Sequence, residues 1–152
     1  MDAYHYTESG LDNVIVYGMM PCVDDDGDRV ITIPNIAGLH RAIAQAIVDH
    51  HAAISGKELR FLRTEMGMTQ AELAKVVHHD PQSVARWEKS EHPMPPTAEA
   101  LIRLLAKERL LLESGLESIE QLSERCIAAA APQPIAINGN DPEHYVVMDK
   151  AA

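Results

Sequence analysis

The chain has 152 residues, enough for one ordinary domain or two small ones, and its apolar fraction of 46% supports a hydrophobic core. No apolar run approaches the roughly 20 residues that span a bilayer, and no basic-then-apolar leader opens the chain. We therefore expect neither a membrane protein nor secretion by a signal peptide. The net charge of −10 argues at first sight against a polyanionic partner.

The two cysteines, Cys22 and Cys126, lie about a hundred residues apart. A disulfide between them is the alternative, but single cysteines so far apart in the sequence favour a reduced, cytoplasmic protein. Two thiols also cannot form an all-cysteine zinc site, which needs four.

Residues 1–54 are predicted to form a small β-hairpin followed by a helix. Val14–Tyr17 and Val30–Ile33 are apolar, β-branched runs typical of strands. Asp24–Asp28, which includes Gly27, suits the tip of a hairpin. The apolar spacing then becomes helical and ends near the adjacent pair His50 and His51, with an inner face of Ile36, Leu39, Ile43 and Ile47.

The aspartate cluster is interpreted as a turn and not as a calcium loop. Asp24, Asp26 and Asp28 have the first spacing of such a loop, but Arg29 stands at the glycine position and Asn35 at the bidentate glutamate position. Adjacent histidine pairs do not share a helix face either, and no zinc-protease spacing occurs. We predict no metal and no other cofactor.

A helix is expected from Ser55 through Met66. Ser55 and Glu58 have the spacing of a capping box, and Gly67 suits the helix end. Its inner face would consist of Leu59, Leu62 and Met66.

Met68–Glu91 reads as two short helices joined by a tight turn. Thr69 and Glu72 form another capping box for the first helix. Asp80 is predicted to cap the second helix, and Pro81 suits its first turn. Leu73, Ala74, Val77, Val84 and Trp87 point inward at helical spacing, whereas the polar residues left facing outward are Gln82, Ser83, Arg86 and Lys89.

This segment resembles the helix-turn-helix of the Cro-like (XRE) family of transcriptional regulators, over about Ser55–Leu112. The matching residues are Thr69–Ala74, Ser83 with Val84, and Trp87 with Glu88. The resemblance implies a repressor-like helical bundle whose second helix enters the major groove of double-stranded DNA.

The flanking segments resemble MqsA-type antitoxins more loosely, through Tyr4–Glu8 and Leu39–Ile43. Those antitoxins carry paired cysteines in an N-terminal zinc module, which this chain does not have. The likeness is therefore to such a protein without its zinc module.

Gln82 and Arg86 lie one turn apart and share a face. Arginine forks onto guanine and glutamine onto adenine, so we expect base contacts from both, with contact to phosphate or water alone as the alternative. Ser83 suits phosphate or base. The resemblance implies that Gln70 bonds a phosphate or braces the recognition helix. Thr69 and Asp80 at the helix starts, with His79 and Lys89, complete the predicted DNA-binding set. Further candidates for phosphate contacts, with a solvated helix face as the alternative, are Arg60, Arg63, Lys75 and His78.

Two positions depart from the family pattern. Pro81 stands where relatives often place a base-reading side chain, so that contact should be missing. His78 stands where a glycine often makes the turn, so it takes a left-handed conformation or the turn differs.

The acidic charge is unevenly distributed. Residues 1–55 hold eight acids and two bases, residues 56–92 hold six of each, and residues 93–152 hold nine acids and five bases. Because phosphate attraction decays over about 8 Å at physiological salt, the neutral charge of the helix-turn-helix matters more than the total. Long-range steering should still be poor, which favours a homodimer.

After the break at Pro93, Pro95 and Pro96, a leucine-rich helix is expected from Thr97 to about Glu113, and a further one from Leu116 to Ala130. From Ala131 onward the pattern dissolves. We predict a mobile tail, with a strand that pairs elsewhere as the alternative.

The sequence predicts a mainly α fold, a helix-turn-helix bundle of about five helices preceded by a small β-hairpin and helix. We divide it into residues 1–54 as a possible dimerisation element, 55–113 as the DNA-binding domain, 114–130 as an additional helix and 131–152 as a tail. The predicted function is a repressor that binds a palindromic operator as a homodimer through residues 81–90. The alternative is an antitoxin that binds a basic toxin and autoregulates its operon, while an enzyme is disfavoured because no catalytic motif occurs.

Overall fold

The computed structural model of the chain describes residues 3–18, 22–23, 25–27, 29–30, 33–49, 53–112 and 134–148. Five helices within these residues, together with a small sheet built around the N-terminal strands, confirm the mainly α prediction. The chain forms two compact units: residues 1–43 with 134–152, here called the sheet unit, and residues 44–133, here called the helical unit. The division falls within helix α1 (Ile36–Asp49).

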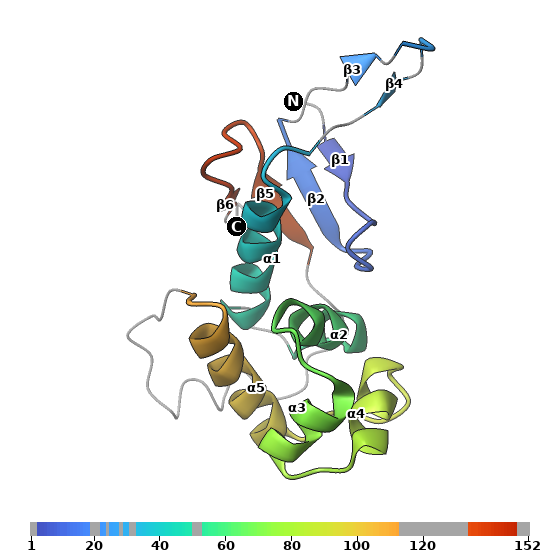
Figure 1. Ribbon diagram of the computed structural model, residues 1–152, viewed down its shortest axis with the longest axis vertical. Helices are drawn as coiled ribbons and strands as arrows, with labels where there is room; N and C mark the ends of the chain where they lie inside the picture. Colours follow the sequence, from blue (N-terminus) through green and yellow to red (C-terminus); the bar gives the residue numbers. More distant parts are fainter. Residues whose placement is uncertain are drawn as a thin grey trace. The chain divides into compact units, whose positions relative to one another are not determined.

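The sheet unit is built around four strands in the order β1-β2-β5-β6. They are β1 (Ala3–His5), β2 (Val14–Tyr17), β5 (Ile135–Asn138) and β6 (Val146–Val147). Strands β2 and β5 are parallel although they come from opposite ends of the chain (Figure 1). Every second side chain of both strands is at most 1% exposed, namely Val14, Val16, Ile135 and Ile137. These alternating residues form the core of the unit.

The predicted hairpin is present, but β2 does not belong to it. A separate two-stranded sheet pairs β3 (Cys22–Val23) with β4 (Arg29–Val30), and a turn at residues 25–27 lies between them. The prediction that Val14–Tyr17 forms one arm of that hairpin is wrong, because β2 pairs with β1 and β5. Strand β2 buries alternate residues and needs a neighbour with matching apolar alternation, which β5 supplies.

The structure also differs from the mobile tail predicted for the C-terminal segment. Beyond the strands β5 and β6, the loop between them is held by hydrogen bonds. The Asn35 side-chain amide donates to the Pro142 carbonyl at 2.9 Å, and the Tyr145 hydroxyl donates to the Pro34 carbonyl at 2.5 Å. Strand β5 is only four residues long and lies between Pro134 and Gly139, two residue types that interrupt strands. The sequence therefore shows no clear alternation of apolar and polar residues there.

The helical unit contains α2 (Gly56–Glu65), α3 (Gln70–Val77), α4 (Pro81–Glu88) and α5 (Pro96–Arg109). Both predicted capping boxes are formed, by Ser55 with Glu58 and by Thr69 with Glu72. Helix α5 starts one residue before Thr97 and ends before Glu113. The helix predicted for residues 116–130 lies outside the described residues. None of the helices in the described ranges is long and apolar enough to cross a membrane.

The four helices of this unit end in the same way. Each is followed by a residue with left-handed backbone, and the next backbone amide bonds back to a carbonyl five residues earlier, as in the Schellman motif. Only the first of these residues is a glycine; the four are Gly67 (φ 69), His78 (φ 60), Ser90 (φ 60) and Leu111 (φ 52). His78 therefore adopts the left-handed conformation that was one of its two predicted options, and the bond from the His79 amide to the Ala74 carbonyl at 2.9 Å closes the turn.

We expect His78→Gly to stabilise the helical unit. A left-handed backbone conformation costs a non-glycine residue about 1–2 kcal/mol, and glycine avoids this cost. Part of the gain is offset because glycine also makes the unfolded chain more flexible. The free energy of unfolding should rise by about 0.5–1 kcal/mol, measured by urea denaturation. The matched control is His79→Gly, which relieves no left-handed strain and should destabilise. Equal loss of stability in the two variants would contradict this account.

Helix α5 joins the ends of two other helices through buried charges. The Arg103 guanidinium donates through Nη1 to the Val48 carbonyl at 3.0 Å, in the last turn of α1, and lies 3.5 Å from the Glu99 carboxylate. The other Glu99 oxygen accepts from the Ile54 amide at 2.7 Å, just before α2. Arg103 and Glu99 are 0% and 2% exposed. This buried pair fixes both sides of the connection between α1 and α2.

Candidate nucleic-acid interface

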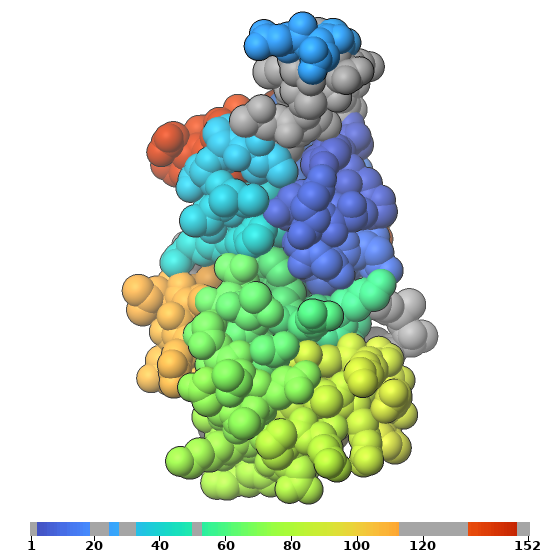
Figure 2. Space-filling model, turned by 45° about the vertical axis from the view of Figure 1, so that its right-hand side comes forward, coloured from blue at the N-terminus to red at the C-terminus, as the bar shows by residue number. Residues whose placement is uncertain are grey.

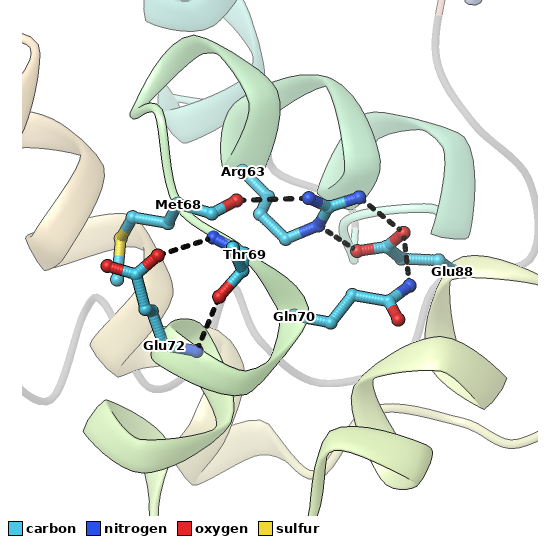
Figure 3. Close-up of polar contacts among 6 residues, drawn as sticks. All are labelled: Arg63, Met68, Thr69, Gln70, Glu72 and Glu88. Atoms are coloured by element: carbon cyan, nitrogen blue, oxygen red, sulfur yellow. Dashed lines mark hydrogen bonds and ion pairs between the residues drawn. The ribbon is translucent and has the colours of Figure 1, made fainter.

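Helix α4 is fixed to α2 by a two-pronged ion pair. Arg63 of α2 donates through Nε to the Glu88 carboxylate at 2.6 Å and through Nη2 to its other oxygen at 3.2 Å (Figure 3). A third donor, Nη1, reaches the Met68 carbonyl at 3.0 Å. Fork-shaped pairs of this kind add orientation as well as energy, so Arg63 aligns α4. The guanidinium nitrogens of Arg63 donate to groups inside the domain, whereas the sequence predicted that Arg63 contacts a DNA phosphate.

Gln70 of α3 completes this cluster. Its side-chain amide donates to the Glu88 Oε1 atom at 3.2 Å, so one carboxylate connects three helices (Figure 3). Of the two roles that the resemblance implied for Gln70, the structure contains the bracing contact. The Glu88 side chain is 5% exposed, and a carboxylate so far removed from water requires these donors.

A close approach of backbones that sequence reasoning missed holds the same, C-terminal end of α4. A Cβ atom on Gly56 would lie 2.5 Å from the carbonyl oxygens of both Trp87 and Glu88. The first residue of α2 thus touches the last turn of α4, and the positive end of one helix dipole meets the negative end of another. Glycine at position 56 is the only residue type that permits this contact, but a single glycine before a helix gives no sequence signal for it.

The starts of α3 and α4 are built differently. Thr69 and Glu72 exchange hydrogen bonds at 3.1 Å in both directions, and donation from the Thr69 backbone, then from its side chain, lowers the pKa of Glu72. Asp80 occupies the N-cap position of α4 as predicted, but its side chain makes no capping hydrogen bond. The capping prediction for Asp80 is therefore wrong in its chemistry. The Ser83 amide, which a capping side chain would bond, donates instead to the Asp80 backbone carbonyl at 3.0 Å. The same carbonyl accepts the ordinary first helical bond, from the Val84 amide at 3.3 Å.

The outward face of α4 carries the predicted polar residues. Val84 and Trp87 are 0% and 6% exposed, which confirms Trp87 as a core residue. Because they anchor the inner face, the opposite side of the helix is exposed at Asp80, Gln82, Arg86 and Lys89 and partly exposed at Ser83. The residues of α3 and α4 form one continuous surface, green and yellow-green in Figure 2.

Most of the outward residues are free to bind a ligand. The side chains of Gln82, Ser83, Arg86 and Lys89 make no hydrogen bond or ion pair with any residue that the structure describes. His79 is exposed, and its ring meets the edge of Trp87 with centroids 4.9 Å apart. The remaining predicted phosphate contacts are exposed as well; they are Arg60, Lys75 and His78. Over the described ranges, no three histidine, cysteine or acidic residues are grouped so as to hold a metal ion.

Residues 59–112 match the family model HTH_3, a helix-turn-helix, which covers about a third of the chain. The matched range begins in α2, includes α3 and α4, and ends just after α5. A search of curated proteins and a search of solved structures found no match. The matched segment, which contains the outward-facing α4, is therefore a helix-turn-helix domain of the Cro-like (XRE) type, a domain that binds DNA in transcription regulators.

Proposed function

We propose that this regulator is a repressor that binds a palindromic operator as a homodimer, with α4 in the major groove. Arg86 makes a two-pronged hydrogen bond to a guanine, and Gln82 contacts an adenine. The phosphate backbone of the DNA is contacted by Lys89, by His79 and by the start of α3 at Thr69 and Gln70. The observation that carries this proposal is the outward face of α4. It presents free side chains from a helix that Glu88 holds to α2 and α3.

The need for a dimer follows from charge and from length. Residues 56–92 hold six acids and six bases, so one copy attracts phosphate weakly. Eight helical residues read only a few base pairs, and two-fold repetition about 34–36 Å apart is the usual remedy. Helix α5 and the residues just after it expose three leucines that suit a contact with a second copy: Leu101 at 42%, Leu104 at 49% and Leu111 at 77%. A reduced cytoplasmic location remains part of the proposal.

The Arg86→Ala variant tests the recognition face. Each good side-chain pair with a base contributes about 1–3 kcal/mol of discrimination, and a dimer loses two, so affinity for the operator should fall at least about 30-fold. The measurement is a gel shift on the DNA upstream of the protein's own coding region, with salt dependence. Arg41→Ala removes the same charge from the exposed side of α1 and serves as control. Full binding by Arg86→Ala would rule out α4 as the reading helix.

The antitoxin role is the second candidate, and the charge of the sheet unit supports it. Residues 1–43 and 134–152 contain ten acidic and three basic residues, a net charge of −7 out of −10. An acidic unit suits a basic toxin by charge complementarity. A small basic protein encoded beside this chain favours the role, and its absence weakens it. The two roles are compatible in one protein.

A further inference from the structure

Asp80 has an exposed carboxylate at the start of the recognition helix, and this carboxylate makes no contact that stabilises the fold. The hydrogen bonds it was expected to accept at the N-cap are made by its own backbone carbonyl. Its side chain has no hydrogen-bond or ion-pair partner within the part of the chain that the structure describes. The groups nearest in sequence are the exposed His79 and Pro81, and neither bonds it. A group that only accepts hydrogen bonds thus stands free where α4 begins.

A carboxylate in this place is costly on DNA unless it meets a donor. Phosphate oxygens are acceptors and carry negative charge, so they repel it. In the major groove the donors are the exocyclic amines of cytosine and adenine. The adenine amine adjoins N7, an acceptor that faces the second carboxylate oxygen unfavourably, whereas cytosine presents its N4 amine alone. Cytosine is therefore the base that a carboxylate fits best.

We propose that Asp80 is a specificity-determining residue that accepts a hydrogen bond from cytosine N4 in each half-site. The inference rests on the proposed function and extends it from the side chains within α4 to the N-cap residue just before the helix. Asp80 disfavours other bases as well as attracting cytosine. At guanine or thymine its carboxylate loses water and gains no donor, and at adenine the N6 amine is accompanied by the repulsive N7 acceptor. Asp80 thereby weakens binding to DNA of unrelated sequence. Specificity then comes from contacts with bases, because a helix-turn-helix with no net charge gains little from phosphate attraction.

The helix geometry sets the spacing of the predicted contacts. At 1.5 Å per residue, Gln82 lies about 3 Å and Arg86 about 9 Å from Asp80 along the helix axis. Base pairs follow one another every 3.4 Å, so these distances correspond to about one and about two to three base pairs. The half-site should therefore contain a preferred cytosine two to three positions from the guanine that Arg86 reads.

The test is selection of bound duplexes from a random pool by the full-length protein. The wild type should select a site with cytosine at one position of each half-site. Asp80→Ala should lose the preference at that position alone, by at least about fivefold, and Asp80→Asn should shift it towards adenine, which asparagine reads. Both should bind an unrelated duplex more tightly than the wild type. Glu91→Gln, which removes the same charge from an exposed residue after α4, should keep the cytosine.

The outcomes separate the two proposals. Thermal unfolding should be nearly unchanged in both variants, since no capping bond is lost. A cytosine preference retained by both variants, or a loss spread evenly over all positions, overturns the role of Asp80 while the operator-binding function stands. A wild type that selects no sequence overturns the proposed function, and the role of Asp80 with it.

Discussion

Deletion of residues 134–152 is expected to unfold the sheet unit and to leave the helical unit folded. Strand β5 lies between β2 and β6, so its loss breaks the four-stranded sheet in the middle. The deletion removes Ile135 and Ile137 from the core, which are 1% and 0% exposed, and the remaining pair β1–β2 is too small to be stable alone. Amide resonances of α2–α5 should persist, whereas those of residues 3–18 should collapse to unfolded positions.

A matched pair of point variants separates the role of β5 from a general effect of truncation. Ile137→Asn places an unpaired amide in the core, and the free energy of unfolding of the sheet unit should fall by about 3–5 kcal/mol. Val146→Asn makes a similar change on β6 at a residue 57% exposed, and should cost less than about 1 kcal/mol. If the two variants were equally stable, β5 would not be a core strand.

Arg103→Leu is expected to destabilise the helical unit by about 3–5 kcal/mol, because it leaves the buried Glu99 carboxylate without its cation. The bond to the Val48 carbonyl at the end of α1 is lost as well. Thermal unfolding followed by circular dichroism measures the effect. Replacing Glu99 also, in Arg103→Leu/Glu99→Leu, removes the stranded charge, so part of the loss should be recovered even though the Ile54 amide loses its acceptor.

Lys107→Leu is the matched control for this prediction. Lys107 also lies on α5 and pairs with Asp49 at 3.8 Å, but the Asp49 side chain is 47% exposed. Water screens such a pair, so its loss should cost about 1 kcal/mol or less. A cost for Arg103→Leu no larger than that of Lys107→Leu would show that the buried pair contributes little.

The sequence predicted best what is local along the chain. The capping boxes at Ser55 and Thr69 need only residues three apart, and the outward face of α4 follows from the inward spacing of Val84 and Trp87. Contacts that depend on a distant partner were missed. Nothing near Ile135 in sequence indicates that its strand lies parallel to β2.

Helix α5 shows why side-chain type alone misleads. Leucines suggest a buried face, yet Leu101 and Leu104 are half exposed while the charged residues Glu99 and Arg103 are buried. The neighbouring backbone decides which side chains of α5 are buried. The Val48 carbonyl in the last turn of α1 and the Ile54 amide before α2 have no partner within a helix, so they bond the charged groups of Arg103 and Glu99. The Asp80 prediction failed for a related reason, since the backbone supplied the bond expected from the side chain.

The parallel pairing of β2 with β5 also fixes an order of events during synthesis. More than a hundred residues separate Tyr17 from Ile135, so at about 5–20 residues per second the ribosome needs on the order of 5–25 s to deliver the second strand after the first. In that interval α2–α5 are already complete, while β2 has an open edge beside Val14 and Val16. A nascent chain can therefore fold helices α2–α5 before its strands β1 and β2, which depend on the later synthesis of β5.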